Sequence, residues 1–167
     1  MSEIVELAVQ AGQALMDRGL LAATAESCTG GGIAMALTEI PGSSLWFESG
    51  FVTYSNASKT RLLNVPAALL EMHGAVSEEV AAAMATGALA NSSAQVAVSV
   101  TGIAGPDGAV PGKPVGTVCF GFAMNRHVHT EKQLFLGDRH GIRAQAVIHA
   151  LKIILQFLQS YSAQAKT

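Results

Sequence analysis

Charged side chains are scarce in this sequence of 167 residues, at 13 % of the total, and the formal net charge is −2. Proteins that bind nucleic acid or an anionic membrane surface usually carry a strong basic patch, and this near-neutral chain has no basic excess. The composition therefore predicts neither a nucleic-acid partner nor a membrane partner. Because half of the residues are hydrophobic, it predicts a large core or a hidden subunit interface.

Cysteines are also few, and long hydrophobic runs are missing. Cys28 and Cys119 are too few for a framework of disulfides, so a reduced, cytoplasmic protein is the simplest interpretation. No segment approaches the roughly 18–20 uninterrupted apolar residues of a membrane span. Glu3 and Glu6 near the N-terminus do not fit a secretory signal.

Metal-ligand spacings and nucleotide fingerprints are missing too. No cluster of His, Cys, Asp and Glu has the spacing of a metal site, so we expect no catalytic metal. Of the two glycine-rich turns, one near residue 30 lacks the lysine of a P-loop, and one near residue 104 lacks the third glycine of a dinucleotide fingerprint. We therefore expect no cofactor.

What the sequence does contain is a strand, a glycine turn and a helix in succession around residues 24–32. The apolar segment 20–25 precedes Ser27, Cys28 and three consecutive glycines, and an amphipathic run over 33–40 follows. Such a turn exposes backbone N–H groups at a helix N-terminus, where they can hold a phosphate or a developing oxyanion. A nucleophile and its oxyanion donors can therefore come from one segment, although many turns of this kind only bind phosphate.

Helical and strand patterns alternate along the rest of the chain. We expect helices over 4–16, 30–40, 56–63, a short stretch from 65, 77–90 and 138–161, and strands over 20–26, 49–54, 95–100, 115–124 and 127–136. This order predicts a single α/β domain, 1–167, with helices covering a mixed sheet. Ligands of such sheets bind at the carboxyl ends of the strands.

Ser27 needs a base, because the pKa of its own hydroxyl is far too high. None of the five scattered histidines has a clear claim, whereas Lys59 opens a helix just after a strand end. A lysine placed in a cleft can lose its charge through desolvation and act as a base. Tyr54, at the end of the preceding strand, is a candidate to relay a proton or to orient the lysine. The alternatives are a solvated helix lysine and a tyrosine at the edge of the core.

A second glycine-rich segment, Thr101-Gly102-Ile103-Ala104-Gly105, follows the strand predicted over 95–100. Its backbone N–H groups are candidates for an oxyanion or phosphate site, and a plain turn is the alternative. Arg139 and Arg143 lie four residues apart on one face of the last helix. Guanidinium groups suit a phosphate, although a salt bridge or a solvated pair is equally compatible with the spacing.

At these residues the chain resembles the CinA C-terminal domain family, the nicotinamide-nucleotide amidases. The matching segments are long and in order, and they span nearly the whole chain. They are Ala25-Glu26-Ser27-Cys28-Thr29-Gly30-Gly31, Gly42-Ser43-Ser44, Gly50-Phe51-Val52-Thr53-Tyr54-Ser55-Asn56, Lys59, Gly74-Ala75-Val76-Ser77, Thr101-Gly102-Ile103-Ala104-Gly105-Pro106-Asp107-Gly108, Lys113-Pro114-Val115-Gly116-Thr117-Val118 and Gly137-Asp138-Arg139.

The resemblance implies an α/β/α sandwich with a mixed, mostly parallel sheet, which commonly forms homodimers. It implies hydrolysis of the carboxamide of nicotinamide mononucleotide to nicotinic acid mononucleotide and ammonia, with Ser27 as nucleophile assisted by Lys59 and Tyr54. We expect the nucleotide to be bound by residues of the two turns and of the strand and helix ends beside them: Thr29, Gly30, Gly31, Asn56, Thr101, Gly102, Gly105, Arg139 and Arg143.

Two alternatives stay open at this point. The same turns can hold a nucleotide without chemistry, in which case the protein is a binding module and Lys59 is a charge partner. Within the enzyme class, Cys28 is the rival nucleophile, because a thiolate is intrinsically more nucleophilic than a serine hydroxyl. The other interpretation of Cys28 is a small buried residue at the start of a helix.

Overall fold

The computed structural model describes residues 1–165, with side chains described as far as Tyr161; residues 166–167 of the predicted domain 1–167 lie outside the described part. The helices are α1 (Glu3–Met16), α2 (Gly32–Thr38), α3 (Asn56–Leu63), α4 (Ala67–His73), α5 (Glu78–Ala90), α6 (Arg139–Ala165) and the short 3₁₀ helix η1 (Ser43–Leu45). The strands are β1 (Ala22–Glu26), β2 (Phe47–Val52), β3 (Val96–Gly102), β4 (Thr117–Met124) and β5 (His127–Leu134).

The strands form one mixed sheet in the order β2-β1-β3-β4-β5. β1 pairs in parallel with both β2 and β3, whereas β4 is antiparallel to β3 and to β5. β4 therefore runs against all the other strands. Because β1, β2 and β3 share one direction, their carboxyl ends meet at one edge of the sheet.

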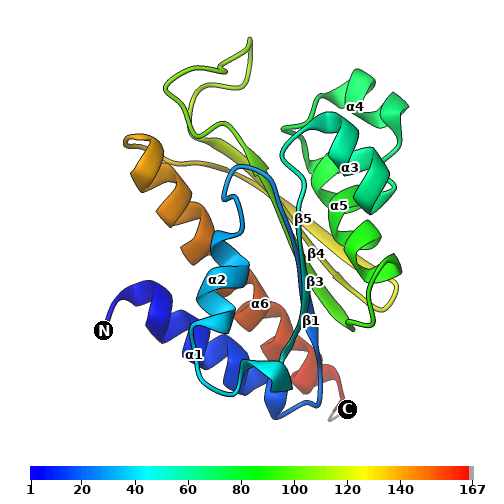
Figure 1. Ribbon diagram of the computed structural model, residues 1–167, viewed down its shortest axis with the longest axis vertical. Coiled ribbons are helices and arrows are strands. Elements are labelled where there is room, and N and C mark those ends of the chain that lie inside the picture. Colours follow the sequence, from blue (N-terminus) through cyan, green and yellow to red (C-terminus); the bar gives the residue numbers. More distant parts are fainter. Residues whose placement is uncertain (166–167) are drawn as a thin grey trace.

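Helices cover both faces of the sheet, which confirms the three-layer α/β/α sandwich (Figure 1). α1, α2 and α6 lie on one face, and α3, α4 and α5 lie on the other. The core under α1, α2 and α6 contains large side chains such as Val98 and Phe120. The opposite face of the central strands carries alanines, including Ala23 and Ala97. This alternation follows from the two-residue period of a strand.

Small residues allow α5 to lie close to the sheet. A Cβ at Gly121 of β4 would lie 2.4 Å from the Ala81 carbonyl oxygen, and one at Gly87 of α5 would lie 1.9 Å from the Leu63 carbonyl oxygen. Ser99 Oγ on β3 donates to the same Ala81 carbonyl at 2.6 Å. Because α3 packs against α5, this close packing also fixes the position of α3 beside the end of β2.

The predicted start of the second glycine-rich turn is wrong. The pattern ended the third strand at Val100, but β3 continues through Thr101 and Gly102, which pair with Cys119 and Val118 of β4. A neighbouring strand supplies ladder hydrogen bonds that outweigh the low strand propensity of a glycine. The turn therefore begins only after Gly102.

Among the described helices, α6 alone is long and apolar enough to cross a membrane by length and composition, over Arg139–Tyr161. In the structure its residues Ile142, Leu151 and Ile154 are buried in the core against the sheet. The hydropathy of α6 thus reflects the wide apolar face by which it packs on the sheet.

Candidate active site

The carboxyl ends of β1, β2 and β3 bring the candidate catalytic residues to one edge of the sheet. Ser27 follows β1, and its N–H donates to the Val100 carbonyl of β3 at 3.0 Å. The turn then reverses within a few residues, with Gly30 at φ 60° and Gly31, the N-cap of α2, at φ 99°. Glycine adopts these left-handed conformations at little cost. Ser27 is thereby held between the end of a strand and the start of a helix, at 8 % exposure.

Lys59 reaches this turn from α3, the helix that follows β2. The Ser55 side chain accepts a hydrogen bond from the Ser58 N–H and caps the first turn of α3. The lysine side chain is 1 % exposed, and its Nζ lies 3.0 Å from Ser27 Oγ. The same Nζ donates to the Thr53 carbonyl at 2.8 Å and to the Tyr54 carbonyl at 3.3 Å. The structure thus brings Ser27 and Lys59 into direct contact.

Three oxygens surround Lys59 Nζ: the Ser27 hydroxyl and the Thr53 and Tyr54 carbonyls. A charged lysine donates to all three, whereas a neutral lysine donates to the two carbonyls and has a lone pair for the Ser27 hydroxyl proton. No carboxylate hydrogen-bonds the amine among the described residues, and burial lowers its pKa below the ordinary value of 10.5. The site therefore favours the form of lysine that can accept a proton.

Cys28 lies in the same turn but in a different environment. It is buried in the apolar core cluster beneath α2, and burial raises the pKa of its thiol to about 12. The Cys28 thiol is therefore uncharged at neutral pH, and no thiolate is present to raise the pKa of Lys59. Burial of the amine, which lowers that pKa, is then the influence that remains. A thiol that stays protonated is a poor nucleophile. The geometry favours Ser27 over Cys28.

A cleft of about 200 Å³ opens over the Ser27–Lys59 contact. It is lined by Ser27, Cys28, Tyr54, Asn56, Lys59, Ala75, Val76, Thr101, Gly102, Ala104 and Arg139. The other residues expected to bind substrate, Thr29, Gly30, Gly31, Gly105 and Arg143, are not among its lining residues. Sequence reasoning missed Ala75, Val76 and Ala104, whose only signal was their place in the family-like segments. Six of the eleven lining residues are polar or charged, which suits a polar small molecule.

Tyr54 contributes to the site through its backbone as well as its side chain. Its carbonyl accepts from Lys59, while its phenol is 62 % exposed and accepts a hydrogen bond from Arg139 Nη2 at 3.2 Å. The proton relay from Lys59 through this phenol is not the arrangement in the structure, because Lys59 contacts Ser27 directly. The phenol lies at the rim of the cleft instead.

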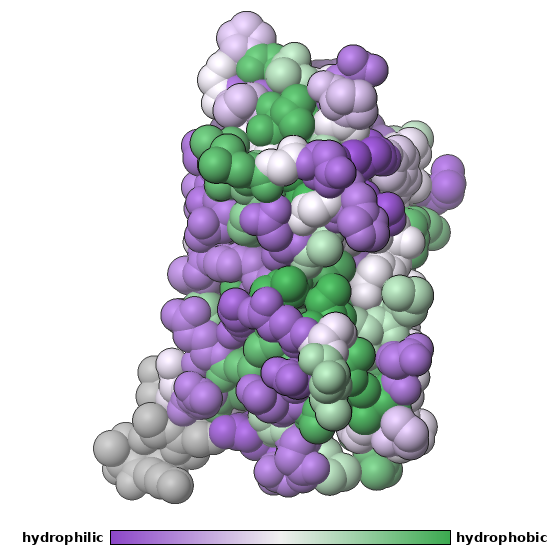
Figure 2. All heavy atoms as spheres, turned by 90° about the vertical axis from the view of Figure 1, so that its left-hand side faces the viewer, coloured by the Kyte–Doolittle hydropathy of each residue, from purple (hydrophilic) through white to green (hydrophobic). Residues whose placement is uncertain are grey.

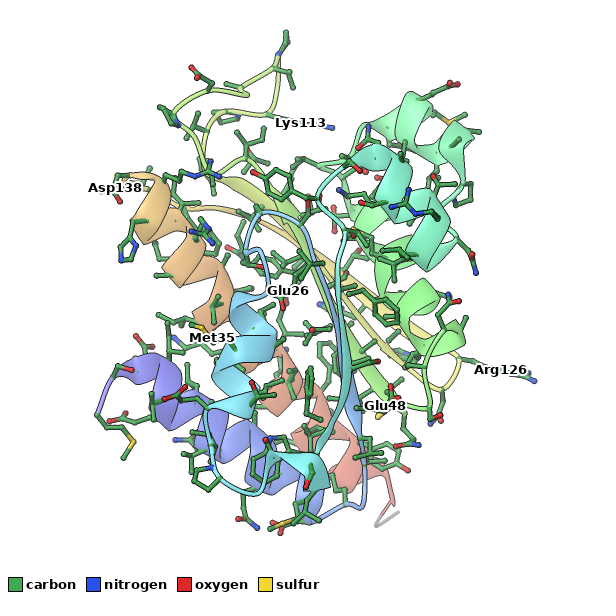
Figure 3. All side chains as sticks on the ribbon, in the orientation of Figure 1. Glu26, Met35, Glu48, Lys113, Arg126 and Asp138 are labelled. Atoms are coloured by element: carbon green, nitrogen blue, oxygen red, sulfur yellow. The ribbon has the colours of Figure 1, made fainter. Side chains whose placement is uncertain are left out.

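Glu26 is a buried residue beside the site that sequence reasoning did not single out. Its carboxylate is fully buried and accepts from Thr29 Oγ1 at 2.7 Å and from the N–H groups of Ile33 and Ala34 at 2.8 and 3.0 Å. Figure 3 shows Glu26 between the sheet and the start of α2. The expected anion at this helix N-terminus is therefore supplied by the protein itself. An acidic residue directly before a glycine turn and a helix was the available signal.

The hydroxyls of the two predicted turn threonines are occupied by the protein. Thr29 Oγ1 donates to Glu26, and Thr101 Oγ1 donates to the Ala75 carbonyl at 2.9 Å. Both side chains are at most 2 % exposed. Thr101 thus ties the end of β3 to the loop before α5, which forms one wall of the cleft.

Arg139 and Arg143 share a face of α6, as their spacing predicts, but they have different partners. Arg139 Nη1 donates to the Gly105 carbonyl at 2.8 Å, next to its contact with the Tyr54 phenol. Asp138, which precedes it, accepts from the Gly141 N–H at 2.8 Å and so caps the helix. Arg139 is exposed at the rim of the cleft.

Arg143 is directed at the first turn rather than at the cleft. Its Nε donates to the Cys28 carbonyl at 3.1 Å, and its Nη2 donates to the Thr29 carbonyl at 3.2 Å. The two arginines therefore do not form one joint clamp for a ligand. Neither a salt bridge nor a fully solvated pair describes them, since both bind backbone carbonyls.

The fold and the site together define an α/β/α protein with a buried serine–lysine contact at the carboxyl ends of its parallel strands. Residues 4–158 match the family model of the CinA C-terminal domain. The chain belongs to the CinA C-terminal domain family, which confirms the resemblance seen in the sequence.

Curated relatives and solved structures agree with this assignment. The chain is 53 % identical over 156 residues to nicotinamide-nucleotide amidohydrolase PncC of Pseudomonas putida, covering 93 % of this chain and 98 % of that protein. It is 52 % identical over 161 residues to PncC of Escherichia coli K12, covering 95 % and 98 %. A CinA superfamily structure from Klebsiella pneumoniae has a TM-score of 0.91 at 37 % identity, covering 94 % of this chain and 98 % of that one.

A longer relative shows the same region within a larger protein. The CinA-like protein of Citrifermentans bemidjiense is 50 % identical over 144 residues, which are 86 % of this chain and only 35 % of that protein. The protein CihA from Agrobacterium tumefaciens, described as competence/damage inducible, has a TM-score of 0.91 at 43 % identity, with 95 % and 97 % coverage.

Proposed function

We propose that this chain is a nicotinamide-nucleotide amidohydrolase, which cleaves the carboxamide of nicotinamide mononucleotide to give nicotinic acid mononucleotide and ammonia. The name and near-complete coverage of the PncC relatives support the substrate class. The observation that carries the chemistry is the 3.0 Å contact between Lys59 Nζ and Ser27 Oγ in a buried cleft. A module that only bound a nucleotide would have no need of a lysine buried against a serine hydroxyl.

The reaction begins with transfer of the Ser27 hydroxyl proton to neutral Lys59. Ser27 Oγ forms a bond to the carboxamide carbon, and the C=O electrons move to the oxygen of a tetrahedral intermediate. When that intermediate collapses, the C–N bond breaks and Lys59 gives its proton to the departing ammonia. Water then attacks the acyl ester, again with Lys59 as the base, and releases the carboxylate and free Ser27. The cationic pyridinium ring withdraws electrons from the carboxamide and so favours attack.

The parts of the substrate are assigned to different walls of the cleft. The carboxamide lies over Ser27, and the phosphate is held by Arg139, which is exposed at the rim and retains free N–H donors. Asn56, at the start of α3, faces the same cleft and is suited to the ribose hydroxyls. Tyr54 forms a wall beside Arg139 rather than a proton relay. Both cysteines are free and buried, which fits a reducing cytoplasmic location for this reaction.

The experiment that tests this function is ammonia release from nicotinamide mononucleotide by the purified protein. We expect turnover by the wild type and a loss of more than about 10⁴-fold in Ser27→Ala, because the nucleophile is removed while the fold is kept. Mass spectrometry is expected to trap an acyl adduct on Ser27. Wild-type protein that binds the nucleotide without releasing ammonia would favour the binding module, and full activity of Ser27→Ala would exclude Ser27 as the nucleophile.

We also propose that the chain forms a homodimer. Figure 2 shows hydrophobic patches among hydrophilic residues on the face formed by α1, α2 and α6. On this face Met35 of α2 is 69 % exposed and Val9 of α1 is 43 % exposed. Apolar side chains left in water at these positions are compatible with a subunit contact. Light scattering after size exclusion measures the mass directly, and a monomer at micromolar concentration would contradict the proposal.

A further inference from the structure

We propose that Arg143 is a positioning residue for the oxyanion: its guanidinium holds the turn in which the Cys28 N–H faces the reacting carbonyl. The proposal rests on the amide hydrolysis proposed above. It assigns Arg143 a different task from Arg139, although the two arginines are one helical turn apart on α6.

The backbone N–H groups of this turn are not equally available. The Ser27 N–H donates to Val100, the Gly30 N–H donates to the Ser27 carbonyl, and the Gly32 N–H donates to the Thr29 carbonyl, each at 3.0 Å. Within the described part of the chain, no backbone-to-backbone hydrogen bond uses the N–H groups of Cys28, Thr29 or Gly31, and of these only the Cys28 N–H directly follows the nucleophile. The Ser27 N–H therefore cannot be the oxyanion donor in this arrangement, and the N–H of the next residue can.

The direction of the Cys28 N–H follows from peptide geometry. In a trans peptide the C=O of one residue and the N–H of the next point in opposite directions. Because the Ser27 carbonyl faces the start of α2 through Gly30, the Cys28 N–H faces away from that helix. Cys28 lines the cleft together with Ser27. In hydrolases with a nucleophile on a strand-to-helix turn, the N–H after the nucleophile is an oxyanion donor.

Arg143 fixes the peptides that follow this N–H. Its planar group binds the Cys28 and Thr29 carbonyls at 3.1 and 3.2 Å, so it restrains two successive peptide planes. It also packs on the turn, since a Cβ at Gly30 would lie 3.4 Å from Arg143 Nη2. On the inner side, Glu26 holds the Thr29 hydroxyl at 2.7 Å. The glycine-rich turn is thereby restrained by Arg143 on one side and by Glu26 on the other. These restraints hold the Cys28 N–H in place before the substrate binds.

The kinetic test compares Arg143→Ala with Arg139→Ala on two substrates, nicotinamide mononucleotide and nicotinamide riboside, which lacks the phosphate. We expect Arg143→Ala to lower kcat by about 10²-fold on both substrates with little change in KM, the size of losing one oxyanion donor. Arg139→Ala is expected to raise KM for the mononucleotide far more than for the riboside. Millimolar guanidinium chloride is expected to restore part of the kcat of Arg143→Ala, which it would not do for a variant that is merely unstable.

A second readout does not depend on the substrate assignment. The rate at which a fluorophosphonate probe labels Ser27, followed by mass spectrometry, requires both an active serine and an oxyanion site. We expect slow labelling in Arg143→Ala and wild-type rates in Arg126→Ala, an exposed arginine far from the cleft (Figure 3). Labelling of the wild type without ammonia release would reject the nicotinamide substrate and leave the Arg143 proposal standing.

Two results would overturn the role of Arg143. One is wild-type labelling and kcat in Arg143→Ala. The other is a KM increase that is confined to the mononucleotide, which would make Arg143 a phosphate ligand. Circular dichroism and the melting temperature of Arg143→Ala and Arg143→Lys establish that both variants are folded. The lysine variant keeps the charge but lacks the planar fork, so we expect it to label slowly as well.

Discussion

The two glycine-rich segments of this chain are similar in sequence and different in structure. The first follows β1, leads into α2 and presents Ser27 to Lys59 at 3.0 Å. The second follows β3 and leads into a loop that projects beyond the sheet before β4 begins (Figure 1). Its Thr101 hydroxyl is engaged with the Ala75 carbonyl. A hydroxyl beside a glycine turn is therefore a nucleophile candidate only where a neighbouring strand end delivers a base and the hydroxyl is not already bound elsewhere.

The glycines of the two segments also serve different purposes. In the first, Gly30 and Gly31 adopt the positive φ angles that the tight turn between β1 and α2 requires. In the second, Gly105 combines a positive φ with close packing, because a Cβ there would lie 2.5 Å from Val115 Cγ1. Gly102 has a similar constraint from Val118 at 2.8 Å. The glycines of the first segment shape the turn that holds Ser27, and those of the second allow close contact between strand and loop.

The sharpest test of this difference is Lys59→Met. It removes the proposed base, which the first segment contacts through Ser27, and we expect kcat to fall by at least about 10³-fold, within the range for losing a general base and its positioning. The fold is expected to persist, because a buried amine without a carboxylate partner contributes little to stability. Ammonia release and the melting temperature measure the two effects. Substantial residual activity would remove the contrast between the segments.

Gly105→Ala tests the second glycine-rich segment, where we expect a loss of stability rather than a loss of activity. A positive φ and a 2.5 Å approach to Val115 together predict a loss of about 2–3 kcal/mol in the free energy of unfolding. Gly30→Ala, at φ 60° with its nearest neighbour at 3.4 Å, is expected to lose about 1 kcal/mol. Urea unfolding of both variants measures the difference. Equal losses would show that packing at the second segment is looser than the structure indicates.

The pH dependence of the first segment follows from the pKa of Lys59. Burial lowers this pKa below the ordinary 10.5, so between the lowered value and 10.5 the native state binds fewer protons than the unfolded chain. The free energy of unfolding therefore rises with pH across that window and is smallest below it. The rate is expected to rise at pH values below the lowered pKa, by up to about tenfold per pH unit as the neutral base forms, and to level off above it.

The matched control for this prediction is again Lys59→Met, in which the rise in stability over that window disappears. Urea unfolding at a series of pH values gives the stability, and kcat at the same pH values gives the ionisation of the base. A rate that stays flat from mildly acidic to alkaline pH would show that proton transfer to Lys59 is not part of the reaction.

The smallest expected effect is that of Cys28→Ala. Because burial raises the pKa of this thiol to about 12, it is protonated during turnover and its loss leaves kcat within a few-fold of the wild type. The cavity left in the core beneath α2 is expected to cost about 1 kcal/mol. Ammonia release and thermal unfolding check both values. An inactive Cys28→Ala beside an active Ser27→Ala would exchange the two roles within the first segment.

The sequence determined the succession of helices and strands and an α/β domain with a mixed sheet. The three-layer sandwich and the pairing of Ser27 with Lys59 followed from the family resemblance, because spacing alone was also compatible with a solvated Lys59. Hydrophobic periodicity and glycine turns are local signals, and parallel strands place their carboxyl ends together. The same reasoning located Tyr54 and Arg139 at the site but not their contacts. Strand ends were displaced where pairing with a neighbouring strand overrode the low strand propensity of a glycine, as at Gly102.

Only the tertiary structure decided how each polar group is used. Arg139 and Arg143 have the same local signal, and they differ because the cleft lies beside one and the first turn lies beside the other. Glu26 is an ordinary acidic residue in the sequence, and burial against the N-terminus of α2 makes it an internal hydrogen-bond acceptor for the Thr29 hydroxyl and the Ile33 N–H. Burial lowers the pKa of Lys59 and raises the pKa of Cys28. Both shifts depend on atoms of segments that are distant in the sequence. Hydrogen-bond partners and desolvation are properties of the packed chain, and neither follows from local spacing.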